Sequence, residues 1–184
     1  MDVLILKEVE PETRVPMTPQ DVGILVKLGA TVQVQAGIGA SLGIEDTAYT
    51  DAGATITGDV EASQASADLV LRLTVPSVDD VSKLKAGAIH ISHMDPFNNK
   101  ELVDAFAANK VSAISLEMIP RTTLAQKMDV LSSQANLAGY AAVLLASERL
   151  DKILAMMMTP AGTISPARVF IIGAGVAGLQ AIAT

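Results

Sequence analysis

The sequence predicts an α/β fold, in which a doubly wound parallel sheet is followed by a long helix and by the opening of a second α/β unit. Short runs of apolar and β-branched residues alternate with segments of helical period, which is the pattern of repeated β-α-β units. Half of the residues are hydrophobic but only 3% are aromatic, so aliphatic side chains and methionine must fill the core. A glycine pattern near the C-terminal end follows one more apolar run and opens the second unit.

The predicted strands are short apolar runs. In chain order they are Val3–Leu6, Thr31–Gln35, Leu69–Leu73, Ala88–Ser92, Val111–Leu116 and Val169–Ile172. The helix between the first two strands is marked at both ends, because Thr18 is a good N-cap, Pro19 suits the first helical position and Gly29 allows a left-handed C-cap. The sequence therefore predicts a helix over residues 19–28.

Two further helices are predicted. The first begins after Asn98 or Asn99 and ends at Ala108. Its buried side is expected to carry Leu102, Val103 and Phe106. The second runs from about Leu124 to about Met157, where no proline occurs and apolar residues recur in steps of four and three. This apolar seam consists of the residues at 124, 128, 131, 135, 138, 142 and 145. A homodimer and packing between two domains of one chain explain it equally well.

These elements divide the chain into an N-terminal α/β part over 1–123, a linking helix over 124–158 and the start of a second α/β part over 159–184. The net charge of −7 argues against nucleic acid and anionic lipid as partners, since both require a positive surface. The absence of cysteine excludes disulfides and a thiolate metal site, which fits the cytoplasm. The longest apolar stretch, Ala141–Ala146, is far shorter than the roughly 20 residues that cross a bilayer, so we expect no direct membrane insertion.

A polar strip runs along the predicted long helix, off its apolar seam. Its members are Gln126, Asp129, Ser132, Ser133 and Asn136. Steps of three or four residues keep them in one sector, and Arg121 stands just before the helix. Such groups can hydrogen-bond a carboxamide and a ribose, the polar parts of a nicotinamide nucleoside. The alternative is structural: Thr123 and Gln126 match a capping box, and Asp129 suits a solvated position in the first turn.

A second set of candidate residues stands at the carboxyl ends of the predicted strands. Arg14 follows the first strand, Arg72 ends the third and His93 follows the fourth. Side chains at these ends converge on the crevice where α/β folds bind ligands, and two guanidiniums with an imidazole can hold a small carboxylate and donate a proton. His90 points to the opposite side from His93, and we interpret it as a core or edge histidine.

The glycine pattern consists of Gly173, Gly175 and Gly178, after a predicted strand and before helix-compatible sequence. This arrangement opens a dinucleotide-binding β-α-β unit, in which the pyrophosphate lies on the N-terminus of the helix. The pattern alone is weakly specific, and the confirming acidic residue about 20 residues further on would lie beyond Thr184. The methionines at 156–158 fit the apolar end of the long helix better than a metal site.

Three long motifs together resemble one family. They are residues 121–140 (RTTLAQKMDVLSSQANLAGY), 156–163 (MMMTPAGT) and 173–184 (GAGVAGLQAIAT). In order and spacing they are similar to the NAD(H)-binding alpha subunit of proton-translocating NAD(P) transhydrogenase, and the resemblance extends over the whole chain. The family usually has an arginine two residues before the glutamine, where this chain has Leu124.

The resemblance implies two Rossmann/flavodoxin-like subdomains with NAD(H) between them, of which the second is incomplete here. A partner domain would bind NADP(H), and hydride would pass directly from NADH to the NADP+ held there. A membrane domain would couple this transfer to proton movement. By motif position, Arg121, Asp129 and Ser132 hold the nicotinamide end, and Gln126 aligns the two nicotinamides. Val176 and the three glycines meet the pyrophosphate. No acid or base is needed at the hydride step. A homodimer, peripheral to the inner membrane through its partner subunits, is implied.

Two alternatives remain. Alanine dehydrogenase shares the ancestry, and in that family an arginine, a lysine and a histidine hold pyruvate, where this chain has Arg14, Arg72 and His93. Arginine in place of lysine keeps the charge but changes the geometry. The chain can also be a non-catalytic truncated remnant or a partial record of a longer gene. Because most of the adenosine side of the site is absent, we expect the isolated 184 residues to bind NADH weakly or not at all.

Overall fold

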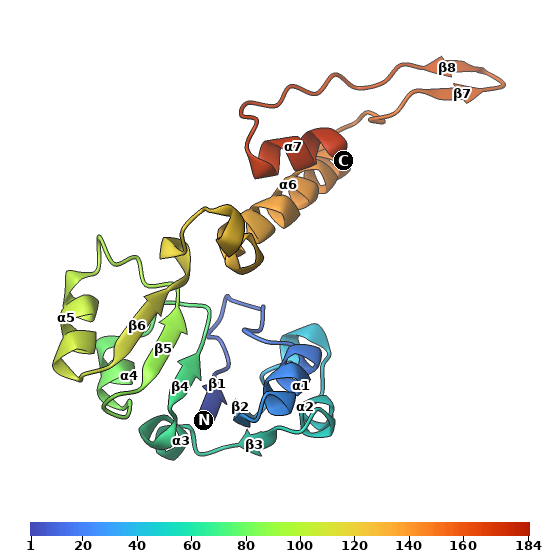
Figure 1. The fold of residues 1–184 in the computed structure, drawn as a ribbon. Coiled ribbons are helices and arrows are strands. Elements are labelled where there is room, and N and C mark those ends of the chain that lie inside the picture. Colours follow the sequence, from blue (N-terminus) through green and yellow to red (C-terminus); the bar gives the residue numbers. More distant parts are fainter. The chain divides into compact units, whose positions relative to one another are not determined.

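The computed structural model describes residues 1–184, and the chain forms two compact units, Met1–Ile119 and Pro120–Thr184. The first unit is built on a six-stranded parallel sheet with the order β3-β2-β1-β4-β5-β6 (Figure 1). Its strands are β1 (Asp2–Ile5), β2 (Thr31–Gln35), β3 (Thr55–Thr57), β4 (Leu69–Leu71), β5 (Ile89–Ser92) and β6 (Ser112–Ser115). Its helices are α1 (Pro19–Lys27), α2 (Asp46–Asp51), α3 (Val60–Ser66), α4 (Val78–Ser82) and α5 (Lys100–Ala108), with 3-10 helices η1 (Ala40–Leu42) and η2 (Leu116–Met118).

Helices cover both faces of this sheet, as a doubly wound fold requires. Because successive strand side chains point to opposite faces, β1 contributes Val3 and Ile5 to one core and Leu4 to the other. The first core includes Val22 of α1 and Tyr49 of α2, whereas the second is closed by α3, α4 and α5. The predicted fold class is therefore confirmed.

The strand order reverses between β1 and β4, which pair in parallel with Ile5 beside Leu71. In open α/β sheets, the crevice at such a switch point, outside the carboxyl ends of the strands, is the usual place for a ligand. The residues that follow these two strands, Glu8 on one side and Arg72 to Thr74 on the other, therefore stand where chemistry is expected.

The sequence located most elements of this unit. Five predicted strands form, but β3 was not predicted because only one of its three residues, Ile56, is apolar. The helix α1 begins as expected, and the Asp21 carboxylate accepts hydrogen bonds from the backbone N–H and hydroxyl of Thr18. Asn99 precedes α5 as its N-cap residue. One core assignment was wrong: Val103 is 43% exposed, because it lies one residue beyond Leu102 on the helical face that turns away from the sheet.

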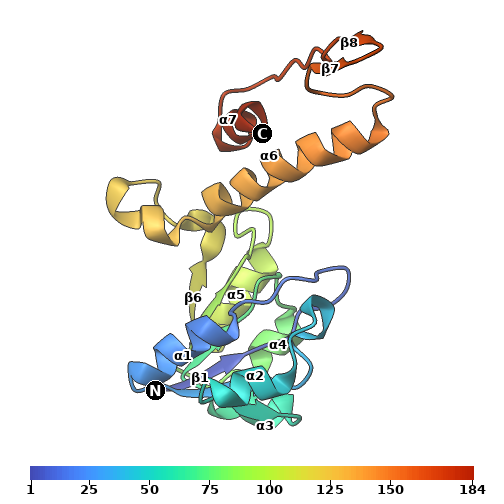
Figure 2. The ribbon, with the colours of Figure 1, turned by 90° about the vertical axis from the view of Figure 1, so that its right-hand side faces the viewer.

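The second unit contains two α-helices, a 3-10 helix and a hairpin. Its elements are the 3-10 helix η3 (Thr123–Met128), α6 (Val130–Arg149), β7 (Met157–Thr159), β8 (Gly162–Ile164) and α7 (Val176–Ala183). The strands β7 and β8 pair antiparallel. Figures 1 and 2 both show α7 lying alongside α6.

The predicted single helix over 124–158 was wrong at both ends. Asp129 has a ψ of 87° and caps the start of α6, so η3 and α6 are separate helices. At the other end the chain leaves the helix at Leu150, which is extended. The methionines at 156–158 consequently belong to the hairpin segment instead of a helix end. No helix in the chain is long and apolar enough to cross a membrane.

The predicted strand at Val169–Ile172 does not form. No other strand of the chain pairs with this segment, so its backbone has no ladder of hydrogen bonds to join. Its side chains are accordingly exposed, Phe170 by 87%. The apolar seam is also largely exposed, from Leu124 (94%) to Leu145 (52%), and the homodimer stays a prediction.

Candidate functional site

A polar cavity of about 500 Å³ lies at the start of α6. Its lining residues are Arg121, Thr122, Thr123, Gln126, Asp129, Ser132 and Val176. The four polar residues that the sequence singled out at 121, 126, 129 and 132 therefore face one space. They do so because η3 turns the chain just before α6 and brings the segment preceding the helix beside its first turn.

Asp129 and Ser132 form a fixed pair at the helix start. The Asp129 carboxylate accepts the backbone N–H of Ser132 at 2.9 Å and the Ser132 hydroxyl at 2.6 Å. These hydrogen bonds lower the pKa of Asp129, first that of the hydroxyl and then that of the N–H, and the charge of Arg121 lowers it further. The pair therefore presents an ionised carboxylate and an oriented hydroxyl.

Arg121 and Gln126 differ from this pair because their side chains make no hydrogen bond or ion pair within the chain. Both are exposed at the cavity. The capping box suggested for Thr123 and Gln126 was wrong, since neither side chain caps η3. Of the other strip residues, Ser133 bonds the carbonyl of Val130. A guanidinium and an amide without protein partners are groups that a ligand can bind.

The glycine pattern of Gly173, Gly175 and Gly178 is called the fingerprint from here on. Each of its three glycines is required for a different steric reason. Gly173 has a φ of +102°, which other residues rarely adopt. Gly175 is the N-cap residue of α7, and a side chain added there would meet nothing within 4 Å, so a ligand can approach the backbone. A Cβ at Gly178 would lie 2.0 Å from the Gly173 carbonyl oxygen, so only glycine allows this close turn.

A second cavity, of about 340 Å³, adjoins the fingerprint. It is lined by Arg121, Ser132, Ala135, Ile172, Gly173, Gly175, Val176, Ala177 and Gly178. Arg121, Ser132 and Val176 line both cavities. The fold of the second unit thus places the polar strip next to the N-terminus of α7, where free N–H groups and the helix dipole favour an anion. These groups suit a ligand with a polar end and a pyrophosphate.

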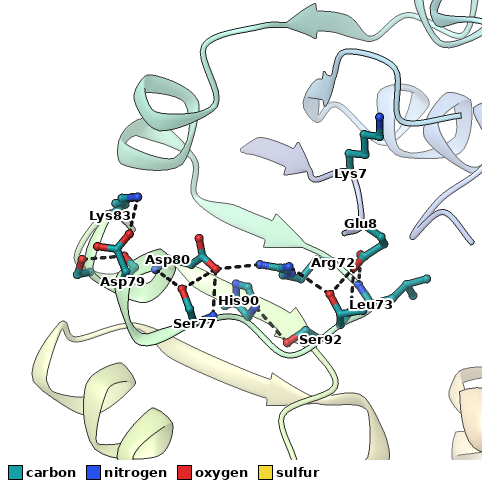
Figure 3. A network of polar contacts seen from close by, with 12 residues as sticks. Lys7, Glu8, Arg72, Leu73, Ser77, Asp79, Asp80, Lys83, His90 and Ser92 are labelled. Carbon is teal, nitrogen blue, oxygen red and sulfur yellow. Dashed lines mark hydrogen bonds and ion pairs between the residues drawn. The ribbon is translucent and has the colours of Figure 1, made fainter. Parts of the chain in front are cut away.

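The switch point of the first unit is bridged by Glu8, a buried residue that the sequence did not single out (Figure 3). Its carboxylate accepts the backbone N–H groups of Leu73 and Thr74 and the Thr74 hydroxyl. Arg72, also buried, donates to Asp80 at 3.2 Å and to Thr74 at 3.1 Å. The available signals were the position of Glu8 three residues after the end of β1 and the capping-box spacing of Ser77 and Asp80.

The three residues predicted to hold a carboxylate are not brought together as a free cationic site. Of the three, Arg72 alone lines the cavity of about 550 Å³ at this end of the sheet. Arg14 pairs with Glu12, and its guanidinium lowers the pKa of that carboxyl to about 2. His93 lies 3.4 Å from the Glu117 carboxylate. Each of the three side chains already has a carboxylate of the chain beside it.

His90 is a core histidine, as the sequence suggested. It is 2% exposed, and its ring lies 5.3 Å from that of Phe106. Nε2 is 3.1 Å from the Ser92 hydroxyl, which donates to the His93 carbonyl, so Nε2 carries the proton. Burial, and then the charge of Arg72, lower the pKa of His90 to about 4.

Comparisons with known proteins relate the chain to one family. Residues 4–138 match the family described as alanine dehydrogenase/PNT, N-terminal domain, and residues 142–184 match its C-terminal domain. An NAD(P) transhydrogenase alpha subunit of Rhodospirillum rubrum is 43% identical over all of this chain and 50% of its own length. An alanine dehydrogenase of Staphylococcus saprophyticus is 31% identical over 98% of this chain and 49% of its own length.

Solved structures give the same picture. The transhydrogenase from Sinorhizobium meliloti superimposes with a TM-score of 0.92 at 46% identity, covering all of this chain and 55% of that one. An L-alanine dehydrogenase has a TM-score of 0.83 at 23% identity over all of this chain and 51% of that one, which supports the fold alone. The chain spans about half the length of the curated relatives it matches.

Proposed function

The chain belongs to the alanine dehydrogenase/PNT family, and from this membership we propose that it forms the NAD(H)-binding part of a proton-translocating NAD(P) transhydrogenase. One observation carries the proposal: Arg121, Ser132 and Val176 line both the polar cavity and the fingerprint cavity. The names of several relatives support it, since four sequences 37% to 43% identical to this chain are named NAD(P) transhydrogenase alpha subunits. The parent protein would then be an oxidoreductase.

In this proposal the polar cavity holds the nicotinamide end of NAD(H). Ser132, whose hydroxyl is fixed by Asp129, and Arg121 hydrogen-bond the carboxamide and the ribose. Gln126 has a free amide that can contact both this ring and the one on the partner domain. Bound NADH supplies the hydride, so the chain's own residues orient the ring and exclude water instead of moving a proton.

The fingerprint cavity holds the pyrophosphate in the same proposal. The open space in front of Gly173 and Gly175 lets phosphate oxygens reach the backbone. Val176 lies between the two cavities and supplies an apolar contact to the part of the ligand that spans them.

The partners follow from the proposed reaction. An NADP(H)-binding domain must present the acceptor nicotinamide, and a membrane domain must couple the transfer to protons. The chain would therefore lie in the cytoplasm, peripheral to the inner membrane through these subunits, and we retain the prediction of a homodimer.

Enzyme assays on the full-length protein with its partner domains test the proposal. We expect NADPH formation from NADH and NADP+, and no alanine formation from NADH, pyruvate and ammonia. Because Arg14, Arg72 and His93 are each beside a carboxylate of the chain, little free positive charge remains for pyruvate. Robust alanine formation would contradict the proposal and favour alanine dehydrogenase.

A further inference from the structure

Gly139 is the one buried residue of α6, and it lies against the backbone of α7. A Cβ added there would lie 2.2 Å from the carbonyl oxygen of Ala177, 2.9 Å from its carbonyl carbon and 3.0 Å from its Cα. All three atoms belong to the main chain, so no side-chain rotation relieves the overlap. The two helices would have to separate by about 1 Å to reach normal contact distances.

The contact at Gly139 belongs to the same face of α6 as the cavities. Ser132, Ala135 and Gly139 follow one another in steps of three and four, which places them in one stripe. The first two line the fingerprint cavity, and Gly139 continues their stripe under α7. The start of α6 carries Ser132, and the start of α7 carries the fingerprint, so the distance between these helices sets the distance between Ser132 and the fingerprint backbone.

We propose that Gly139 is a positioning residue, which holds α7 close enough to α6 for one dinucleotide to engage the polar cavity and the fingerprint at the same time. This inference rests on the proposed function, because it assumes that both cavities bind parts of NAD(H). A separation of about 1 Å would leave the fingerprint backbone itself intact but would misplace it relative to Ser132, which lines both cavities, and displacements of that size reduce catalysis by up to about a hundredfold.

The test compares Gly139→Ala with a matched control in the full-length protein. Gly23→Ala makes the same change in α1, where the added Cβ would have no neighbour nearer than 3.8 Å. Alanine favours a helix over glycine, so both changes improve helix propensity. The Kd of NADH is measured by fluorescence, and the Kd of ADP, which engages no nicotinamide contact, by calorimetry.

We expect Gly139→Ala to raise the Kd of NADH at least tenfold and to leave that of ADP within twofold, whereas Gly23→Ala changes neither. An unchanged NADH affinity in Gly139→Ala would overturn the inference. Equal losses for NADH and ADP would also overturn it, because they indicate a damaged fold. Failure of the unsubstituted protein to bind NADH would count against the proposed function itself, which separates the two failures.

Discussion

Polar groups are used in opposite ways in the two units. At the switch point of the first unit, Glu8, Arg72 and Asp80 bond one another or the adjoining backbone. In the second unit, Arg121 and Gln126 face a cavity, and their side chains make no hydrogen bond or ion pair in the chain. The physical reason is burial: an unpaired buried polar group costs free energy, whereas an exposed one is satisfied by water until a ligand replaces it. A cluster of charges at a switch point is therefore not evidence of a ligand site unless some of those charges are free.

The largest expected effect concerns the hydrogen bonds of Glu8 at the switch point. Glu8→Ala removes the acceptor of two backbone N–H groups and one hydroxyl, so we expect the free energy of unfolding to fall by about 4 kcal/mol. Urea denaturation measures this loss. Glu10→Ala is the control, because Glu10 is exposed and its removal should change stability by less than about 0.5 kcal/mol. Equal stabilities of the two variants would show that the network does not hold the switch point together.

A second prediction uses pH to probe the same network. The pKa of His90 is about 4 in the folded chain, against 6.5 in the unfolded one. As pH falls below 6.5, His90 becomes protonated in the unfolded chain but stays neutral in the folded chain, so the free energy of unfolding declines. Below about pH 4, His90 is protonated in both states and contributes no further decline. Arg72 strengthens the effect and Asp80 opposes it.

Measured between about pH 7 and about pH 4.5, this histidine should contribute about 2 kcal/mol of lost stability. His90→Gln cannot titrate, so its stability should depend less on pH by that amount, while the carboxylates contribute equally in both proteins. Hydrogen exchange of β5 amides reports the first unit directly. If the two proteins lose stability in parallel, the interpretation of His90 as a buried neutral histidine fails.

The same contrast explains what could be predicted from the sequence. Five strands of the first unit were located because they are apolar runs that find a paired neighbour, and some place side chains in a core, as at Val32 and Val70. In the second unit, Val169–Ile172 has the same local pattern but no strand beside it, and the prediction failed. Local pattern indicates that a segment can form a strand, whereas pairing decides that it does.

For the candidate site residues, too, local pattern predicted some features and missed those that depend on tertiary structure. The positions of Arg121, Gln126, Asp129 and Ser132 near the fingerprint could be inferred from helical spacing and from family resemblance. The break at Asp129 could not, because the continuous apolar period hides a capping residue. The neutralisation of Arg72 by Asp80 was also missed, since it joins two elements and depends on tertiary packing.

A third prediction tests Arg121, whose side chain faces the polar cavity. Arg121→Ala should leave the stability of the chain within about 0.5 kcal/mol, because the exposed side chain has no hydrogen bond or ion pair to lose. In the full-length protein it should weaken NADH binding about thirtyfold, which corresponds to about 2 kcal/mol for a hydrogen bond from a charged group. Thermal denaturation and fluorescence titration measure the two effects. Loss of stability without loss of NADH affinity would show that Arg121 stabilises the fold and does not bind the cofactor.

The smallest expected effect is at Leu124, which is 94% exposed on η3, two residues from Gln126. Leu124→Arg removes almost no packing, so stability should not change. The new positive charge near an anionic cofactor is worth about 0.5 kcal/mol at roughly 8 Å in water, or about a twofold gain in NADH affinity at low salt. Salt of about 1 M should abolish this gain, because it screens charges beyond about 3 Å. Leu124→Gln is the uncharged control. A gain in NADH affinity that persists at high salt, or appears with glutamine, would mean that residue 124 contacts the cofactor directly. The ligand site would then extend along the whole of η3.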